Sequence, residues 1–402
     1  MFELHGKYGT AKVFASVVDS EAVGQVVALL NQPYIEGSKI RMMPDIQAGA
    51  GCTVGTTMTI QDAVCPNIVG CDIGCGMEVV MLKETDIDLE RLDQIIRAQV
   101  PSGLNRRGNS HRYIKNTRLR ELRCKNEAAL PLAEISLGTL GGGNHFIEVD
   151  RDDEGRLYLV IHSGSRILGI KVSNYYQKMA YKQHQGLDPY SIETFIQNLK
   201  NAGRNKEIPA ELKNLYANPP KAHIKESLAY VSGPLLDDYL HDMEIVQEYA
   251  EWNRNAIADM ILKAAELHLD GRMTTIHNYI DVEHRILRKG AVSAQEGEQL
   301  IIPMNMRDGS LLCTGKGNSE WNYSAPHGAG RQVSRGKAKS MFSVDEFKRS
   351  MEGIYTTSVG PATLDECPMA YKDMSVILEN IEPTVTVDKV IRPIYNFKAG
   401  NE

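Results

Sequence analysis

The sequence lacks the features that assign a chain to the membrane, to secretion or to a disulfide-bonded scaffold. None of its apolar runs approaches the roughly 18 residues that a membrane-spanning helix needs, and its start, MFELHGKYGTAK, has no charged-then-apolar signal pattern. Its seven cysteines form no tandem CxxC pairs, which argues against a disulfide framework or a structural zinc ribbon. We therefore expect a cytoplasmic protein with reduced thiols and no membrane partner.

An excess of positive charge is missing too. The chain has 45 Lys and Arg residues against 51 Asp and Glu residues, which gives a net charge of −6. A polyanion would therefore have to be held by a local basic patch rather than by the whole surface. The chain has 402 residues, 42% of them apolar, and shows no internal repeat or low-complexity stretch. We expect one integrated globular unit over residues 1–402.

Apolar periodicity predicts three helices. Asp19 and Ser20 precede an apolar segment with a 3.6-residue period, Asp86–Val100 repeats the pattern, and Asp237–Leu269 extends it over a longer stretch. The glycine-punctuated runs IRMMPDIQAGAGCTVGTTM and NIVGCDIGCGMEVVML predict buried strands separated by tight turns. The more polar stretch 188–232 predicts a helical insertion with loops.

The turn GCDIGCGM holds the first candidate metal ligands. Asp72 and Cys75 are three residues apart between glycines, so a carboxylate and a thiolate can converge on one ion. The alternative is a structural turn in which the aspartate bonds locally and the cysteine acts as a small buried hydrophobe.

Three histidines stand in similar positions. His145 follows the glycine run of GTLGGGNHFIEV, His162 ends the apolar run LYLVIHSGSR, and His277 lies in TTIHNYI. A lone histidine is more often a satisfied core residue. Together with the thiolate and the carboxylate, however, the three imidazoles form a borderline-soft ligand set that suits manganese, zinc or iron better than magnesium or calcium. The sequence therefore predicts a transition-metal site.

Phosphate-binding features lie beside these ligands. The glycine run before Asn144 lets backbone amides approach a phosphate closely, with Glu148 at the start of the next strand. The run lacks the Lys and Ser/Thr of a P-loop, and no GxGxxG opens a helix there. Arg166, in HSGSR, is a phosphate-compatible group.

Two basic stretches also fit an interaction with phosphate groups. In NYSAPHGAGRQVSRGKAK, His327 lies among small residues ahead of Arg331 and Arg335. A neutral imidazole is a competent nucleophile toward phosphorus, and guanidiniums stabilise the charge that develops on a phosphoryl group. The alternative is a basic surface loop with an incidental histidine. Residues 105–125 hold eight Lys or Arg residues against a single Glu121, which fits binding of a phosphate backbone or, alternatively, a solvated helix face.

These motifs together resemble the RtcB family of RNA ligases. The resemblance covers most of the chain through MPDIQAGAG, VGCDIGCGM, LGTLGGGNHFIE, HSGSR, RKGAVSAQEG, HGAGRQVSR and PMAYKD. It implies a mixed α+β fold of the family's type, with central β-sheets, surrounding helices and a metal site in a cleft. It also implies a single catalytic domain over residues 1–402 with 188–232 as an insertion.

The activity implied by the resemblance is RNA ligation. RNA ending in a 2′,3′-cyclic phosphate or 3′-phosphate would be joined to RNA beginning with a 5′-hydroxyl, in tRNA splicing or RNA repair. The implied cofactors are GTP and two Mn²⁺ ions, and the implied partners are the RNA ends and an archease-like activator.

The resemblance also assigns roles to residues of this chain. Cys75 would bridge the two metal ions, with Asp72 and His145 completing one shell. His162 and His277 would hold the other ion. His327 would be the nucleophile that takes GMP from GTP, and Asp45 matches a functional acidic position. The implied guanylate contacts are Asn144, Glu148, Asn305, Ala329, Gly330, Tyr371 and Lys398. The implied contacts to RNA or triphosphate oxygens are Arg166, Arg331 and Arg335.

Two positions depart from the family pattern. Gln47 stands where MPDVH usually has histidine, and Asn305 stands in IPMNMRDG where IPGSMG has serine. These departures bear on nucleotide preference and on the rate of guanylylation. The altered IPMNMRDG region keeps one alternative open, a metal-dependent RNA cyclic phosphodiesterase that does not ligate. The basic stretch 105–125 keeps open another, a non-catalytic protein that binds RNA or the ribosome.

Overall fold

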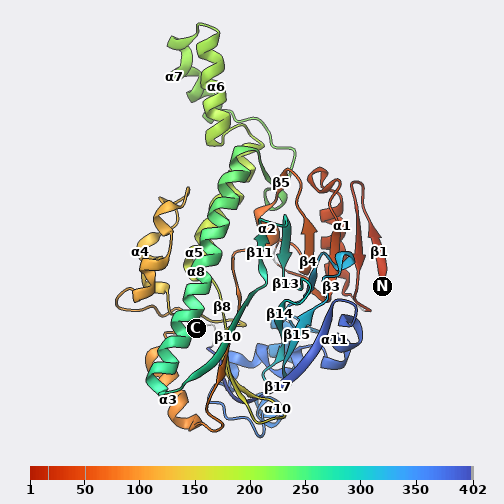
Figure 1. Ribbon diagram of the computed structural model, residues 1–402. Helices are drawn as coiled ribbons and strands as arrows, with labels where there is room; N and C mark the ends of the chain where they lie inside the picture. The colour runs from red at the N-terminus through yellow and green to blue at the C-terminus, as the bar shows by residue number, and fades with distance from the viewer. Residues whose placement is uncertain (17, 50, 400–402) are drawn as a thin grey trace.

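Two β-sheets form the frame of the protein in the computed structural model, which describes residues 1–16, 18–49 and 51–399 (Figure 1). The six-stranded sheet has the order β1 (Phe2–His5), β2 (Thr10–Val13), β3 (Ile40–Gln47), β4 (Val54–Thr59), β12 (Ile286–Lys289) and β11 (Asn278–Asp281). The seven-stranded sheet has the order β10 (Leu269–Ile276), β6 (Gly76–Leu82), β8 (Leu157–Ser163), β7 (Phe146–Arg151), β17 (Val385–Phe397), β15 (Gly309–Gly315) and β14 (Gln299–Asn305). The mixed α+β fold class is confirmed.

Two short strand pairs accompany these sheets. The strand β13 (Ala291–Ser293) pairs with β16 (Ser324–Pro326), and β5 (Ala63–Val64) pairs with β9 (Val231–Ser232). Every pairing within the seven-stranded sheet is antiparallel. The start of each strand therefore lies beside the end of its neighbour.

The three predicted helices are present. The first, α1 (Ser20–Leu30), begins where the Asp19 side chain accepts a hydrogen bond from the Ala22 amide. The second, α3 (Leu89–Gln99), is capped by Asp88 in the same way. The third, α8 (Pro234–Ala265), ends four residues before the predicted boundary, because Leu269 already belongs to β10.

One predicted strand is wrong. The apolar residues of NIVG form the short helix α2 (Pro66–Val69). Proline at the first helical position has its φ already set for a helix and needs no amide partner there, so the apolar run starts a turn of helix. The strand that follows, β6, begins only at Gly76, after the GCDIGC turn.

The stretch 188–232 contains the predicted helices. The helix α6 (Pro189–Asn201) starts at the Asp188 cap, and α7 (Ile208–Ala217) follows it. Figure 1 shows both helices projecting from one end of the molecule, away from the two large sheets. That residues 1–402 act as a single catalytic domain stays a prediction.

The apolar core lies between the sheets and their helices. The largest cluster joins the six-stranded sheet to α1, α8 and α5 (Arg166–Gln183), and a second cluster packs α3 and α8 against the seven-stranded sheet. The remaining helices are α4 (Leu130–Ser136), α9 (Arg335–Met341), α10 (Val344–Ser350) and α11 (Met374–Ile381). Within the described ranges, no helix combines the length and the apolarity needed to cross a membrane.

Candidate metal centre and nucleotide cavity

The five predicted metal ligands meet at one edge of the seven-stranded sheet. Cys75 directly precedes β6, His145 directly precedes β7, and His162 lies near the end of β8. These strands are antiparallel neighbours, so the starts of β6 and β7 lie beside the end of β8. His277 follows β10, which pairs with β6, and the next residue opens β11 in the other sheet. The sheet topology therefore gathers residues that are far apart in sequence.

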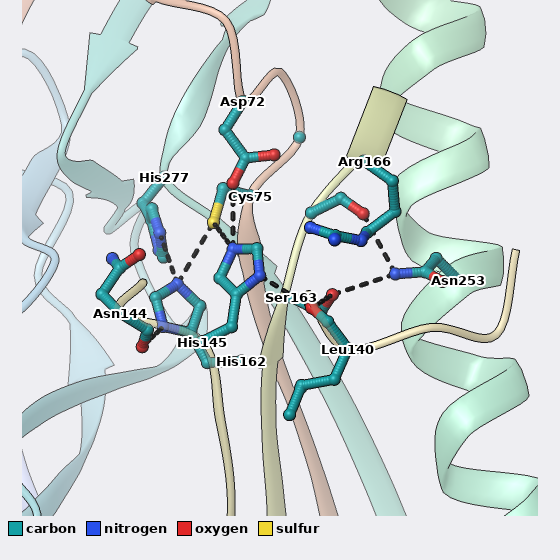
Figure 2. Close-up of polar contacts among 12 residues, drawn as sticks. Asp72, Cys75, Leu140, Asn144, His145, His162, Ser163, Arg166, Asn253 and His277 are labelled. Atoms are coloured by element: carbon teal, nitrogen blue, oxygen red, sulfur yellow. Dashed lines mark hydrogen bonds and ion pairs between the residues drawn. The ribbon is translucent and has the colours of Figure 1, made fainter. Parts of the chain in front are cut away.

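The ligand atoms form two groups that share one cysteine. Figure 2 shows the five side chains pointing toward one another. His162 Nε2 lies 3.2 Å from Cys75 Sγ and 3.2 Å from His277 Nε2. His145 Nε2 lies 3.4 Å from the same sulfur, and 3.0 Å from Asp72 Oδ2. In each group, Cys75 with His162 and His277 or Cys75 with Asp72 and His145, all ligand atoms lie within 4.8 Å of one another.

Backbone carbonyls fix the protonation of two of these rings. His145 Nδ1 donates to the Leu140 carbonyl at 2.8 Å, and His162 Nδ1 donates to the Asn144 carbonyl at 3.1 Å. A carbonyl can only accept, so each Nδ1 carries a proton and each Nε2 is directed toward Cys75. Orientation of metal-binding histidines by such bonds is the usual arrangement. The donor set therefore fits a pair of transition-metal ions.

Burial determines the charge of these groups in the absence of a metal. It lowers the pKa of His162 and of His277 well below the usual range, so both rings are neutral. It raises the pKa of the Cys75 thiol well above its usual range, and the charge of Asp72 adds to that rise. Burial also opposes ionisation of Asp72, but His145 and Arg166 outweigh it and lower the pKa of that carboxyl. A bound cation would supply the charge that a thiolate at Cys75 needs.

Helix α8 braces the metal turns from behind with two buried polar residues. Asn253 donates to Ser163 Oγ at 3.0 Å and to the Gly164 carbonyl at 3.1 Å. Arg254 donates to the carbonyls of Gly74 and Ser163 at 2.8 and 3.1 Å. Sequence reasoning missed both residues. The available signal was a pair of polar residues within the apolar pattern of a long helix.

His327 is held by a buried carboxylate. Its Nδ1 donates to Asp45 Oδ2 at 2.6 Å, and its backbone amide donates to the same oxygen at 3.2 Å. Because Nδ1 is engaged, Nε2 is the ring nitrogen left for chemistry. Lys372 donates to the carbonyls of Pro44 and Ile46, on either side of Asp45. The ring centroids of His327 and His277 are 4.9 Å apart, so the candidate nucleophile borders the metal group.

A cavity opens next to His327. All seven predicted guanylate contacts line it, together with His327, Arg331 and Arg335: Asn144, Glu148, Asn305, Ala329, Gly330, Tyr371 and Lys398. They come from β7, β14 and the loop after β16, from positions next to β7 and β17, from the start of α9 and from the residue after the 3₁₀ segment Pro368–Ala370. Gly330 has a φ of +73°, and a Cβ there would lie 2.4 Å from the Asp45 carbonyl oxygen, so the loop needs glycine at this point.

The comparisons agree with this geometry. A family model described as tRNA-splicing ligase RtcB matches residues 25–134 and 116–399. The RNA-splicing ligase RtcB of Escherichia coli (strain K12) is 29% identical over 422 residues, which cover 94% of each chain. The tRNA-splicing ligase RtcB of Archaeoglobus fulgidus is 27% identical over 431 residues, which cover 89% of this chain and 86% of the relative.

The chain belongs to the RtcB family. Its curated relatives are named as ligases of RNA splicing or tRNA splicing, so it is a member of an RNA ligase family.

The two departures from the RtcB pattern have defined contacts. Gln47 lines the cavity, and its Oε1 accepts a hydrogen bond from the Arg331 amide at 2.9 Å. Asn305 also lines the cavity, but its Oδ1 accepts from the amides of Arg307 and Asp308 and its Nδ2 donates to Asp308. Most of its hydrogen-bonding capacity is therefore used within the turn between β14 and β15. A direct contact of Asn305 with the guanylate stays a prediction.

Arg166 lies apart from the cavity, beside the metal groups (Figure 2). Its backbone is left-handed, with a φ of 56°, a strained conformation that a closely packed site can hold. Its guanidinium donates to Thr139 Oγ1 at 3.3 Å and is one of the charges that lower the pKa of Asp72.

The basic stretch 105–125 packs against α8 and is not a continuous helix. It contains two short 3₁₀ segments, Arg112–Asn116 and Leu119–Glu121. Acidic residues of α8 pair with three of its arginines: Arg112 with Asp259, Arg118 with Glu248, and Arg123 with Asp238. The stretch is therefore not the helix face of the alternative, although most of its basic residues are exposed to solvent. RNA binding by this stretch stays a prediction.

Glu366 is a cavity residue that sequence reasoning missed. It lies in the 3₁₀ segment Pro361–Glu366, and only 3% of its side chain is exposed. Neighbouring Lys398, Arg335 and Arg331 outweigh its burial and lower its pKa to about 2. The only available signal was its place two residues before the PMAYKD motif.

Proposed function

We propose that this chain is a GTP- and Mn²⁺-dependent RNA ligase that joins 2′,3′-cyclic phosphate or 3′-phosphate ends to 5′-hydroxyl ends through a guanylylated His327. The observation that carries the proposal is the His327–Asp45 pair, which lies between a cation-lined cavity and a cysteine-centred donor set. We expect it to act in the cytoplasm on RNA, in tRNA splicing or RNA repair, with an archease-like protein as its activator.

The His327–Asp45 pair suits attack on the α-phosphate of GTP. Asp45 accepts a hydrogen bond from Nδ1–H, and the proton stays on Nδ1. The Nε2 lone pair then forms a P–N bond to the α-phosphorus, while the bond from that phosphorus to the bridging oxygen breaks and pyrophosphate leaves. The imidazole becomes cationic in this step, and the buried Asp45 carboxylate stabilises that charge. No proton has to leave Nε2 before the attack.

The cavity offers groups for both ends of the nucleotide. Arg331, Arg335 and Lys398 supply positive charge for phosphate oxygens. Glu148 supplies a carboxylate for the N–H donors of a guanine edge, and Asn396 Nδ2 holds it at 2.5 Å. Burial raises the pKa of Glu148 to about 8, and hydrogen bonds from guanine would favour its ionised form.

The donor set at Cys75 suits manganese because it mixes sulfur, nitrogen and oxygen. Metal ions bound there would stabilise negative charge on phosphate oxygens during each displacement. Water would open a cyclic phosphate to the 3′-phosphate. An oxygen of the 3′-phosphate would then attack the phosphorus on His327 and break the P–N bond. The 5′-hydroxyl would next attack the activated RNA phosphate, and GMP would leave. Arg166, next to Asp72, is the candidate contact for the RNA phosphate.

Covalent labelling tests the proposal. The protein with Mn²⁺ is incubated with GTP carrying a labelled α-phosphate, and wild type is compared with His327→Ala and with His268→Ala, an exposed histidine paired with Glu84. We expect acid-labile, alkali-stable label on wild type and on His268→Ala, and none on His327→Ala. Label that survives in His327→Ala would refute the histidine intermediate.

A second function has one specific observation in its favour. The Asn305 amide is engaged within its own turn, which leaves one fewer group for the nucleotide. A cyclic phosphodiesterase that does not ligate would need no nucleotide contact. Hydrolysis of a 2′,3′-cyclic phosphate by metal-loaded protein that takes no label from GTP would favour that function.

A further inference from the structure

One carboxylate ties together four side chains of the nucleotide cavity. Glu366 Oε2 accepts from Tyr371 Oη at 2.7 Å and pairs with Lys398 Nζ at 2.8 Å. Its other oxygen, Oε1, pairs with Arg331 Nη1 at 3.2 Å and also with Arg335 Nη1. The four partners are the residues from which we expect contacts to guanylate or to phosphate oxygens, and Glu366 is their common acceptor.

The ammonium group of Lys398 is held by two oxygen atoms of the protein. An ammonium group has three N–H donors. Within the described part of the chain, one is directed at Glu366 and one at the Asn144 carbonyl, 3.3 Å away. The backbone amide of Lys398 donates to Ser358 Oγ at 2.9 Å, so the loop that carries Glu366 fixes the lysine at both ends. Among the described residues the third donor has no further hydrogen-bond acceptor, and the Phe146 ring, which also lines the cavity, lies 5.6 Å from Nζ.

Arg331 and Tyr371 are held in the same manner. Arg331 also donates to the carbonyls of Asp365 and Val333, and its guanidinium lies over the Tyr371 ring, 5.1 Å from the centroid. The tyrosine hydroxyl donates to Glu366 and accepts a hydrogen bond from Arg331 Nη1 at 3.3 Å. All four groups are therefore oriented before any nucleotide enters, which lowers the entropic cost of binding.

We propose that Glu366 is the positioning residue of this cavity, and that its carboxylate directs Lys398, Tyr371, Arg331 and Arg335 toward GTP. The inference rests on the proposed function, because it takes GTP as the ligand. A different role would follow if Glu366 merely occupied the place of a phosphate group: its loss would then free the cations and strengthen nucleotide binding. The two roles predict opposite changes in affinity.

Asp365 provides a matched control. It is a buried carboxylate adjacent to Glu366, and its side chain pairs with Arg335 and Lys339. Within the described residues, its side chain pairs with neither Lys398 nor Tyr371. Asp365→Asn therefore removes one buried negative charge at the same place without releasing the lysine and the tyrosine.

The experiment compares wild type, Glu366→Gln, Glu366→Asp and Asp365→Asn, each loaded with Mn²⁺ and checked by thermal unfolding. Binding is measured with α,β-methylene-GTP, which cannot transfer GMP, and KM and kcat are measured from labelling with GTP. For Glu366→Gln we expect KM and Kd to rise about 10-fold or more and kcat to change less, because a buried charged acceptor shared by several donors is lost. Glu366→Asp should recover part of the affinity, and Asp365→Asn should have the smaller effect.

Tighter binding by Glu366→Gln, or unchanged KM and Kd, would overturn the proposal. If Glu366→Gln fails to fold, Tyr371→Phe and Glu366→Asp carry the test, and unchanged affinity in both would overturn it. A wild type that binds the analogue but takes no label would refute the proposed chemistry alone, since Kd still reports on positioning. A wild type that does not bind the analogue would overturn both.

Discussion

The metal centre and the nucleotide cavity are neighbours with opposite electrostatic character. Around Cys75, a carboxylate, a thiol and lone pairs of imidazole nitrogens converge, and Arg166 is the cation that acts on Asp72 there. In the cavity, Lys398, Arg331 and Arg335 converge on the single carboxylate of Glu366. The first region is built to take up a cation and the second to take up an anion. His277 and His327, whose ring centroids are 4.9 Å apart, mark the border.

The comparison also separates two ways of fixing side chains. Two of the metal ligands, His145 and His162, are oriented by backbone carbonyls of the loop between α4 and β7. The cavity cations are oriented by another side chain, that of Glu366 in the 3₁₀ segment Pro361–Glu366. We therefore expect substitutions in the metal centre to abolish function and substitutions in the cavity to change affinity by degrees.

The largest effect is expected for Cys75→Ala. Both ligand groups include this sulfur, so its loss removes one donor from each. Loss of a residue that only hydrogen-bonds to a metal ligand lowers metal affinity or activity about 10- to 100-fold. For the shared ligand itself we therefore expect the guanylylation rate to fall by at least about 1,000-fold. Bound manganese, counted by elemental analysis, should fall as well. The control is Cys71→Ala, an exposed cysteine four residues away. Full manganese content and activity in Cys75→Ala would contradict the assignment.

Asp45→Asn should have the next largest effect. The amide cannot balance the charge that develops on His327. Removal of the comparable carboxylate from a catalytic triad lowers kcat about 10⁴-fold. We expect a single-turnover guanylylation rate about 100-fold or more below wild type with manganese content unchanged. Glu84→Gln, in the exposed pair with His268, is the control. An unchanged rate would mean that Asp45 does not orient the nucleophile.

Glu148 predicts a pH dependence in the cavity. Burial raises its folded-state pKa to about 8, above the ordinary carboxyl value, so the folded protein holds a proton that the unfolded chain releases. This contribution to stability is present below the unfolded-state pKa and is lost as the pH rises through about 8. Glu148→Gln should therefore show a smaller fall in Tm between pH 5 and pH 8 than wild type. An identical Tm profile would contradict the shifted pKa.

The Glu148→Gln variant should also lose preference for GTP over ATP.

The smallest effect is expected for Gln47→Ala. Gln47 accepts one hydrogen bond from the Arg331 amide at the rim of the cavity. A bond of this kind contributes about 1 kcal/mol, so KM for GTP should rise about fivefold with kcat nearly unchanged. Gln25→Ala, whose side chain bonds to Gly49 outside the cavity, is the control. A large loss of kcat would show that Gln47 takes part in the chemistry.

Local patterns in the sequence predict the metal centre better than the cavity. Asp72 and Cys75 share one turn, and each histidine stands at a strand boundary that apolar periodicity reveals. Asp45 lies in a strand 282 residues from His327, so without the structure its role as hydrogen-bond acceptor has no physical basis. Glu366 ends the 3₁₀ segment Pro361–Glu366 and Lys398 directly follows β17, so their pairing depends on tertiary packing.

Local sequence patterns also fail to predict features of α2 and α8. The apolar run at Pro66 fits either a strand or a turn of helix, and proline at the first position decides for the helix. Asn253 and Arg254 are buried polar residues whose partners are backbone carbonyls of distant turns. A periodicity analysis shows only that they interrupt an apolar pattern.

His277 joins the two large sheets, because β10 ends directly before it and β11 begins directly after it. An ion bound by His277 in this connection and by His162 in β8 would link the two sheets. Ligand binding confined to the folded state stabilises that state by mass action. The stability of the whole fold would then depend on metal supply, as its activity would. Protein made in a manganese-poor cell would be degraded by proteases faster than metal-loaded protein.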